Sequence, residues 1–279
     1  MTRSLFGPDK FRTECRPYNS LDNVTFLVMT GSRYKKDRYE DQVLATWATV
    51  PSIRDRVIAV SDKADNYTGV VTFPEVEGKD SYDDAQHRQP RFIRSYLSSH
   101  KLWPSTDWLL VLDDDTYVNI DKFRRFLDRY DPRLSLSFGY VFADGIDKDS
   151  PITQRLRFGW FSGGGGILMS RPTIEYLMEN LYTSKHCPFD WFNDKTIAVC
   201  TKTKSDAIHV HTGAFSAFKL DHQWNFKRTN LPVLRDILTA HMGGAYSGNQ
   251  GHTGAPNMHP YDLCLKKSES ESSEIMSTC

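Results

Sequence analysis

Short apolar runs alternate along the chain with stretches whose apolar residues recur at helical spacing. The runs that have the length of buried strands are residues 23–30, 56–61, 70–73 and 108–112. Helical spacing covers residues 38–48, 83–100 and 120–130. Strands that alternate with helices of this length indicate βαβ units. We therefore predict an α/β fold with a mostly parallel central sheet flanked by helices.

The second half of the chain is less regular. It begins with an expected strand over 135–142, and the apolar run "ILMS" precedes an expected helix from 171 to about 181. Residues 243–259 are rich in Gly, Asn and His and are expected to form a loop. The boundaries that we expect are an arm over 1–22, one domain over 23–265 and a disordered tail over 266–279.

Charge and length narrow the class of protein. The 279 residues include 35 basic and 35 acidic side chains, and this balance does not favour a nucleic acid or an anionic membrane as partner. No apolar run approaches the roughly 20 residues that span a bilayer, so we expect no membrane segment in this chain. Five cysteines without a CxxC pair are too few for a disulfide scaffold.

Three consecutive carboxylates, Asp113, Asp114 and Asp115, follow the buried run that starts at Trp108. Adjacent negative charges repel each other, and a cation relieves that repulsion. Alternate residues of an extended segment point the same way, so Asp113 and Asp115 can share Mg²⁺ or Mn²⁺. A turn followed by a helix N-cap is the alternative. In parallel sheets ligands bind beyond the carboxyl ends of strands, where the polar loop after Thr30 also lies.

Three further segments carry groups suited to binding or catalysis. Ser162–Gly166 has four glycines, which either admit a ligand close to the backbone or form a bend before a strand. Asp194 lies among aromatic residues and beside Lys195, as a general base or as a helix cap. His209 and His211 share one face of an expected strand, as metal ligands or as a structural pair.

Taken in order, these segments resemble those of a known family. The runs "TFLVMTGS…ATW", "VLDDDTYVNI", "WFSGGGGILMSR", "NDKTIAVC" and "HVH" are similar to the Fringe-like β-1,3-glycosyltransferases, over about residues 23–211. That family includes the Fringe N-acetylglucosaminyltransferases and the core-1 galactosyltransferases. The resemblance implies a GT-A type nucleotide-sugar-binding fold. It also implies a nucleotide-binding half over 23–130 and an acceptor half over 131–265.

The resemblance assigns roles to the charged residues. The three aspartates match the DxD-type element that binds a UDP-sugar through Mn²⁺. Asp115 would be the direct metal ligand, and Asp113 and Asp114 would lie nearer the nucleotide and sugar. His211 matches the second metal ligand. Asp194 matches the catalytic base.

The resemblance also assigns binding and structural roles. Thr30 and the loop after it would contact the uridine, and Cys187 would form a disulfide with Cys200. The residues that would line the donor and acceptor cleft include Gly163, Gly164 and Gly165. Two departures from the family pattern are Phe192-Asn193 in place of Pro-Asp and four glycines in place of Gly-Gly-Ala-Gly. Because the glycine segment differs from the family pattern, the resemblance does not identify the acceptor.

The expected function is that of an inverting, Mn²⁺-dependent β-1,3-glycosyltransferase. It would transfer GlcNAc or galactose from a UDP-sugar to a glycan or glycoprotein acceptor. The family implies the Golgi or another secretory-pathway lumen, with the cytoplasm as the alternative. Two other functions fit parts of the pattern. One is a sugar-binding module that has lost turnover, and the other is a metal-dependent phosphohydrolase that would need further ligands for a second metal.

Overall fold

A computed structural model describes most of the domain that the sequence predicts. The described residues are 21–142, 160–183, 185, 187, 189, 192–204, 206–216 and 237–242. Most of the expected arm, the loop over 243–259 and the tail lie outside them. Within the described residues, no helix has the length and apolar character needed to cross a membrane.

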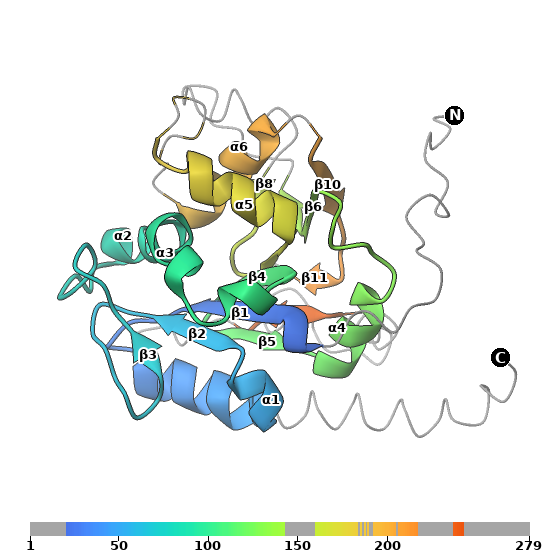
Figure 1. Cartoon of the computed structure of the whole chain (residues 1–279). Coiled ribbons are helices and arrows are strands. Elements are labelled where there is room, and N and C mark those ends of the chain that lie inside the picture. Colours follow the sequence, from blue (N-terminus) through green and yellow to red (C-terminus); the bar gives the residue numbers. More distant parts are fainter. Residues whose placement is uncertain are drawn as a thin grey trace, which may run out of the picture.

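A seven-stranded sheet forms the centre of the fold (Figure 1). Its strands, in spatial order, are β10 (Ile208–His211), β6 (Leu136–Gly139), β9 (Ile167–Ser170), β4 (Trp108–Asp113), β1 (Val24–Met29), β2 (Val57–Val60) and β3 (Val70–Val71). Strand β9 is antiparallel to both of its neighbours, and the other neighbouring strands are parallel. The predicted α/β class with a mostly parallel sheet is therefore confirmed.

Helices cover both faces of this sheet. They are η3 (Lys35–Trp47, a π-helix), α1 (Pro51–Arg54), α2 (Tyr82–Ala85), α3 (Arg88–Ser95), α4 (Ile120–Leu127), α5 (Arg171–Asn180) and α6 (Asn193–Thr203). Short 3₁₀ turns lie at η2 (Leu21–Asn23), η4 (Leu97–Ser99) and η5 (Trp103–Ser105). Figure 1 shows α3, α5 and α6 over one face and α1 beneath the other.

Alternation along the strands builds a core on each face of the sheet. In β4, Leu110 and Leu112 pack into the core that η3 and α4 cover, whereas Leu109 and Val111 pack into the core beneath α3, α5 and α6. All four side chains are buried. Because successive strand residues point to opposite faces, a run that is apolar at every position is suited to a sheet covered on both sides.

One predicted helix is wrong in its extent. Residues 83–100 form α2, α3 and η4 instead of a single helix, with the first break at Gln86 and His87. Pro90 is the third residue of α3. Proline lacks an N–H and is tolerated in the first turn of a helix but not in its interior, so α3 starts just before it.

A small second sheet brings the C-terminal part of the described chain to the central sheet. It contains β11 (Phe215–Ser216), β12 (Thr239–His241) and β5 (Thr116–Val118), with β12 antiparallel to β5. His241 pairs with Thr116 in this register. A separate pair consists of β7 (Val141–Phe142) and β8 (Trp160–Phe161), so the strand expected over 135–142 is divided between β6 and β7.

Candidate active site

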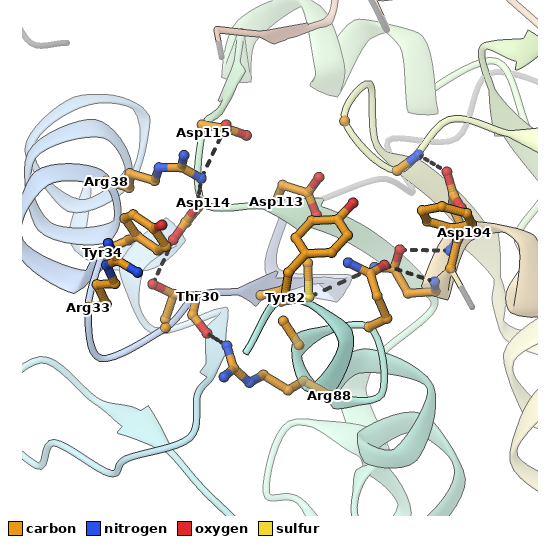
Figure 2. Close-up of a pocket in the computed structure, with 18 of the residues that line it drawn as sticks. Thr30, Arg33, Tyr34, Arg38, Tyr82, Arg88, Asp113, Asp114, Asp115 and Asp194 are labelled. Atoms are coloured by element: carbon orange, nitrogen blue, oxygen red, sulfur yellow. Dashed lines mark hydrogen bonds and ion pairs between the residues drawn. The ribbon is translucent and has the colours of Figure 1, made fainter. Parts of the chain in front are cut away.

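A cavity of about 650 Å³ lies at the carboxyl ends of β1 and β4. These parallel strands end side by side, with Met29 opposite Asp113 in the register. The predicted site residues that line the cavity are Thr30, Asp113, Asp114, Asp115, Gly163, Gly164 and Asp194. Gly165 and His211 are not among its lining residues. Figure 2 shows Asp194 on the side of the cavity opposite Tyr34 and Arg38.

The direction of β9 explains how the glycine segment reaches the same edge of the sheet. Because β9 runs antiparallel to β4, it begins where β4 ends. The glycines that precede Ile167 therefore lie beside the aspartates that end β4. At Gly166 the backbone φ is +88°, a left-handed conformation that favours glycine.

Asp113, Asp115 and His241 form a group that could hold a metal ion. Each offers one ligand atom, and these atoms lie within 4.8 Å of one another. The His241 Nε2 atom is 3.3 Å from an oxygen of Asp115. Two carboxylates and an imidazole suit Mn²⁺ or a similar divalent cation.

Burial and mutual repulsion raise the pKa of two of the aspartates. For Asp113 the larger cause is burial, followed by the negative charge of Asp115. Burial and Asp115 likewise raise the pKa of Asp114, while Arg38 and a hydrogen bond from Thr30 oppose that rise. The Thr30 hydroxyl donates to the Asp114 carboxylate at 2.7 Å. The three aspartates therefore carry more negative charge than their surroundings stabilise. A bound cation would relieve the repulsion between them.

The structure does not bring His211 to this group. His211 ends β10, the edge strand of the sheet, and β6 and β9 lie between β10 and β4. Three strand spacings put it roughly 14 Å to the side of β4. Its Nδ1 atom accepts a hydrogen bond from the Val141 N–H at 3.0 Å.

Burial lowers the pKa of the neighbouring His209 to about 4, so that ring is neutral at neutral pH.

His241 was missed in the sequence because its strand is short. The nearest feature in the sequence is the short run "ILTA" over residues 237–240, which directly precedes the histidine but is too short to show a period. The pairing of β12 with β5 then carries His241 to the aspartates that precede β5.

Asp194 lies in the first turn of α6 and faces the glycine segment. One carboxylate oxygen accepts a hydrogen bond from the Gly163 N–H at 3.0 Å, and the other accepts from the Lys195 N–H at 2.7 Å. The Lys195 ammonium lies 4.9 Å from the Trp160 ring and 4.7 Å from the Phe192 ring. These two aromatic rings thus contact the Lys195 ammonium, next to Asp194 in the sequence.

A buried amide network connects the end of β4 with the start of α6. The Gln89 side-chain N–H groups donate to the carbonyls of Leu112 at 2.6 Å and Leu27 at 3.2 Å. The Gln89 carbonyl oxygen accepts from the Asn193 amide at 2.5 Å, and the Asn193 carbonyl oxygen accepts from the Asp194 N–H at 2.8 Å. The asparagine that departs from the family pattern thus joins α6 to α3 and, through Gln89, to the ends of β1 and β4.

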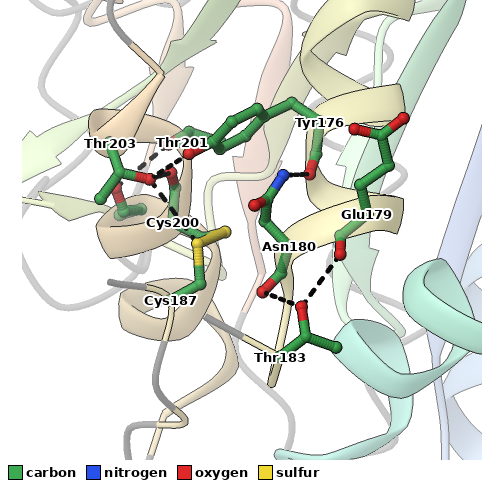
Figure 3. The surroundings of a disulfide bond; sticks show 9 residues. Tyr176, Glu179, Asn180, Thr183, Cys187, Cys200, Thr201 and Thr203 are labelled. Atoms are coloured by element: carbon green, nitrogen blue, oxygen red, sulfur yellow. Dashed lines mark hydrogen bonds between the residues drawn. A yellow bond between two sulfur atoms is a disulfide. The ribbon is translucent and has the colours of Figure 1, made fainter. Parts of the chain in front are cut away.

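The implied disulfide between Cys187 and Cys200 is present (Figure 3). It joins the segment before α6 to the third turn of that helix, across 13 positions of sequence. The Thr203 hydroxyl donates to the Cys200 carbonyl at 2.6 Å. Both cysteines are buried in the core beneath α3 and α5.

Comparison with known proteins establishes the family. The Fringe-like family matches residues 19–221, most of the chain, and the protein therefore belongs to that family. This range includes the three aspartates, the glycine segment and Asp194. His241 lies beyond it.

Individual relatives are more distant. The chain is 32% identical over 92 residues to glycoprotein-N-acetylgalactosamine 3-beta-galactosyltransferase 1 of Xenopus laevis, covering 33% of this chain and 23% of that protein. It is 23% identical over 164 residues to the human beta-1,3-glucosyltransferase, covering 59% of this chain and 30% of that protein. The matches thus span under a third of the length of these relatives. Among solved structures, a glycosyltransferase involved in glycosylation of the major capsid of PBCV-1 shares 16% identity at a TM-score of 0.46, covering 86% of this chain and 98% of that one.

Proposed function

We propose that this protein is an inverting β-1,3-glycosyltransferase of the GT-A type that uses a UDP-sugar donor and a divalent cation. The observation that carries the proposal is the placement of Asp194 on the wall of the same cavity as Asp113, Asp115 and His241. A metal group and a separate carboxylate are the two parts that this reaction requires. The family of the chain and the names of its relatives support the reaction class.

In this proposal Asp113, Asp115 and His241 hold the cation, and His241 takes the role that the sequence assigned to His211. Bound Mn²⁺ would neutralise the negative charge that develops on the departing UDP. Thr30 and Asp114, joined by their hydrogen bond, would position the nucleotide. The donor sugar is GlcNAc or galactose, and the acceptor is a glycan or a glycoprotein.

Asp194 would act as the general base. Its carboxylate takes the proton of an acceptor hydroxyl, and the acceptor oxygen forms a bond to the anomeric carbon. The bond between that carbon and the phosphate oxygen breaks, and its electron pair leaves with UDP. The Gly163 N–H holds one carboxylate oxygen in place during this step.

We also propose that the protein works in an oxidising compartment, such as the lumen of the secretory pathway. The disulfide between Cys187 and Cys200 supports this, because such bonds persist in oxidising environments and are rare in the cytosol. Peptide mapping of the protein from its native source under non-reducing conditions tests the proposal. Free thiols at both positions would contradict it.

Calorimetric titration of Mn²⁺ and UDP, followed by a hydrolysis assay with a panel of UDP-sugars, tests the function. Wild type should bind UDP only when the cation is present. In the hydrolysis assay it should slowly hydrolyse one UDP-sugar of the panel and release UDP. His241→Gln should weaken Mn²⁺ binding, whereas the matched control His211→Gln should not. Equal UDP affinity with and without Mn²⁺ would contradict the metal assignment. Binding without any turnover would favour the sugar-binding module.

A further inference from the structure

Arg38 places a guanidinium against the aspartates of the cavity. One of its terminal nitrogens is 3.3 Å from an oxygen of Asp114 and 3.4 Å from an oxygen of Asp115. Its side chain is 14% exposed, and its guanidinium carbon lies 4.6 Å from the centre of the Tyr34 ring. Figure 2 shows the guanidinium beside these two aspartates.

Asp115 is shared between this ion pair and the metal group. One of its oxygens faces Arg38, and the other faces His241. A positive charge already beside a carboxylate makes it less favourable to place a divalent cation on the same group. Arg38 and a metal ion therefore compete electrostatically for Asp115.

The guanidinium is also suited to a phosphate. It has five N–H donors in a planar fork, which matches the oxygens of a phosphate better than an ammonium does. The Tyr34 ring and Asp114 fix its plane, so that little side-chain freedom would be lost on binding. Arg38 lines the cavity itself, within reach of a ligand that contacts Asp115.

We propose that Arg38 binds a phosphate of the nucleotide donor, and that before the donor binds it neutralises Asp115 in place of the cation. Divalent cation and donor then enter together, because the cation takes over Asp115 while the phosphate takes over Arg38. This inference rests on the proposed function, which supplies the cation and the diphosphate. It predicts that replacing Arg38 raises the affinity for Mn²⁺ alone and lowers the affinity for UDP.

Calorimetry with the full chain separates these effects. Arg38→Gln should bind Mn²⁺ alone more tightly than wild type, by about tenfold, because a competing charge-assisted contact is gone. With saturating Mn²⁺ the same variant should bind UDP about 10- to 100-fold more weakly, while its affinity for uridine, which has no phosphate, is unchanged. Arg38→Lys should bind Mn²⁺ alone with near wild-type affinity because it keeps the charge.

Arg33→Gln is the matched control. Arg33 lines the same cavity and lies 5.5 Å from the same Tyr34 ring, so the variant removes an equal charge nearby. It should change the affinity for Mn²⁺ alone much less than Arg38→Gln does. A loss of structure in Arg38→Gln would weaken the binding of both Mn²⁺ and UDP, and that result would overturn the inference. Unchanged Mn²⁺ affinity or unchanged UDP affinity would also overturn it. Absence of Mn²⁺ binding by wild type would instead overturn the proposed function, and the inference with it.

Discussion

At the scale of single residues, Gly164 shows how closely the glycine segment approaches the metal group. A Cβ atom at this position would lie 2.7 Å from the Nδ1 atom of His241, too close for any real contact. The imidazole occupies the space that a side chain would need. Gly164 therefore allows His241 to reach Asp113 and Asp115.

We expect Gly164→Ala to displace the His241 ring and to weaken Mn²⁺ binding. Disturbing the groups that orient a metal ligand typically lowers metal affinity about 10- to 100-fold. Gly213→Ala is the control, because no atom of the described residues lies within 4 Å of a Cβ there. Titration of both variants with Mn²⁺ measures the effect. Wild-type affinity in Gly164→Ala would show that His241 is not a ligand.

Asp194→Asn should separate catalysis from donor binding. The amide keeps the size of the side chain but cannot accept a proton, so kcat should fall about 10²- to 10⁴-fold with an unchanged KM for the donor. Steady-state kinetics with a verified acceptor measures both constants. A variant that turns over at a near wild-type rate would mean that another carboxylate is the base.

The sequence predicts the acidic part of the cavity because these residues follow strands with clear patterns. Asp113 and Asp115 come directly after five apolar positions, and Thr30 follows another buried run. His241 ends a strand of three residues, and such a strand has no period that can be recognised. The metal group also depends on the pairing of β12 with β5, a contact between distant segments that local patterns do not encode.

At the scale of elements, α3 and α6 are held in register with β4 by Gln89 and Asn193. Asn193→Asp restores the residue type of the family pattern, yet we expect it to destabilise this chain. An ionised carboxylate would face the Gln89 carbonyl oxygen at the position of the present 2.5 Å bond. The Gln89 amide cannot rotate in compensation without losing its bonds to Leu27 and Leu112.

Urea unfolding should show a loss of about 1–3 kcal/mol for Asn193→Asp at pH 7, the range for an unsatisfied buried partner. The loss should shrink in acid, where a protonated carboxyl can again donate to Gln89. Equal stability of the variant and wild type at pH 7 would mean that the network does not hold α6.

The elements themselves were predicted where their period is long and unbroken. The apolar faces of η3, α4 and α5 indicate helices close to those observed. The break before α3 required attention to Pro90 instead of the apolar period, because a missing N–H outweighs a continuous apolar face. The reversed direction of β9 has no local sequence signal, since the side chains of a buried strand alternate in either direction.

At the scale of the whole molecule, the aspartate group should make stability depend on pH. Burial and Asp115 raise the pKa of Asp113 to about 7 in the folded state, against about 3.9 in an unfolded chain. The folded state thus keeps a proton that the unfolded state releases between these values. The stability that this proton contributes is complete below about pH 4 and is lost as the pH rises to 7.

Asp113→Asn removes this titrating group together with its charge interaction with Asp114 and Asp115. In EDTA, the variant should gain stability relative to wild type as the pH rises from 4 to 7, by on the order of a few kcal/mol. Denaturant unfolding at several pH values measures the difference. Added Mn²⁺ should then stabilise wild type at pH 7 but not the variant. A difference that stays constant with pH would mean that Asp113 ionises normally.

The proposed role of His241 on β12 as a metal ligand also bears on when the cation site is completed during synthesis of the chain. Asp115 and His241 are separated by 126 residues, and His241 reaches Asp115 only when β12 pairs with β5. A nascent chain that has emerged as far as β10 already holds every strand of the central sheet, yet it lacks the imidazole. At roughly 5–20 residues per second, ribosomes need a few more seconds to supply it. The growing polypeptide would therefore pass through a stage that has the sheet but not the full cation-binding group.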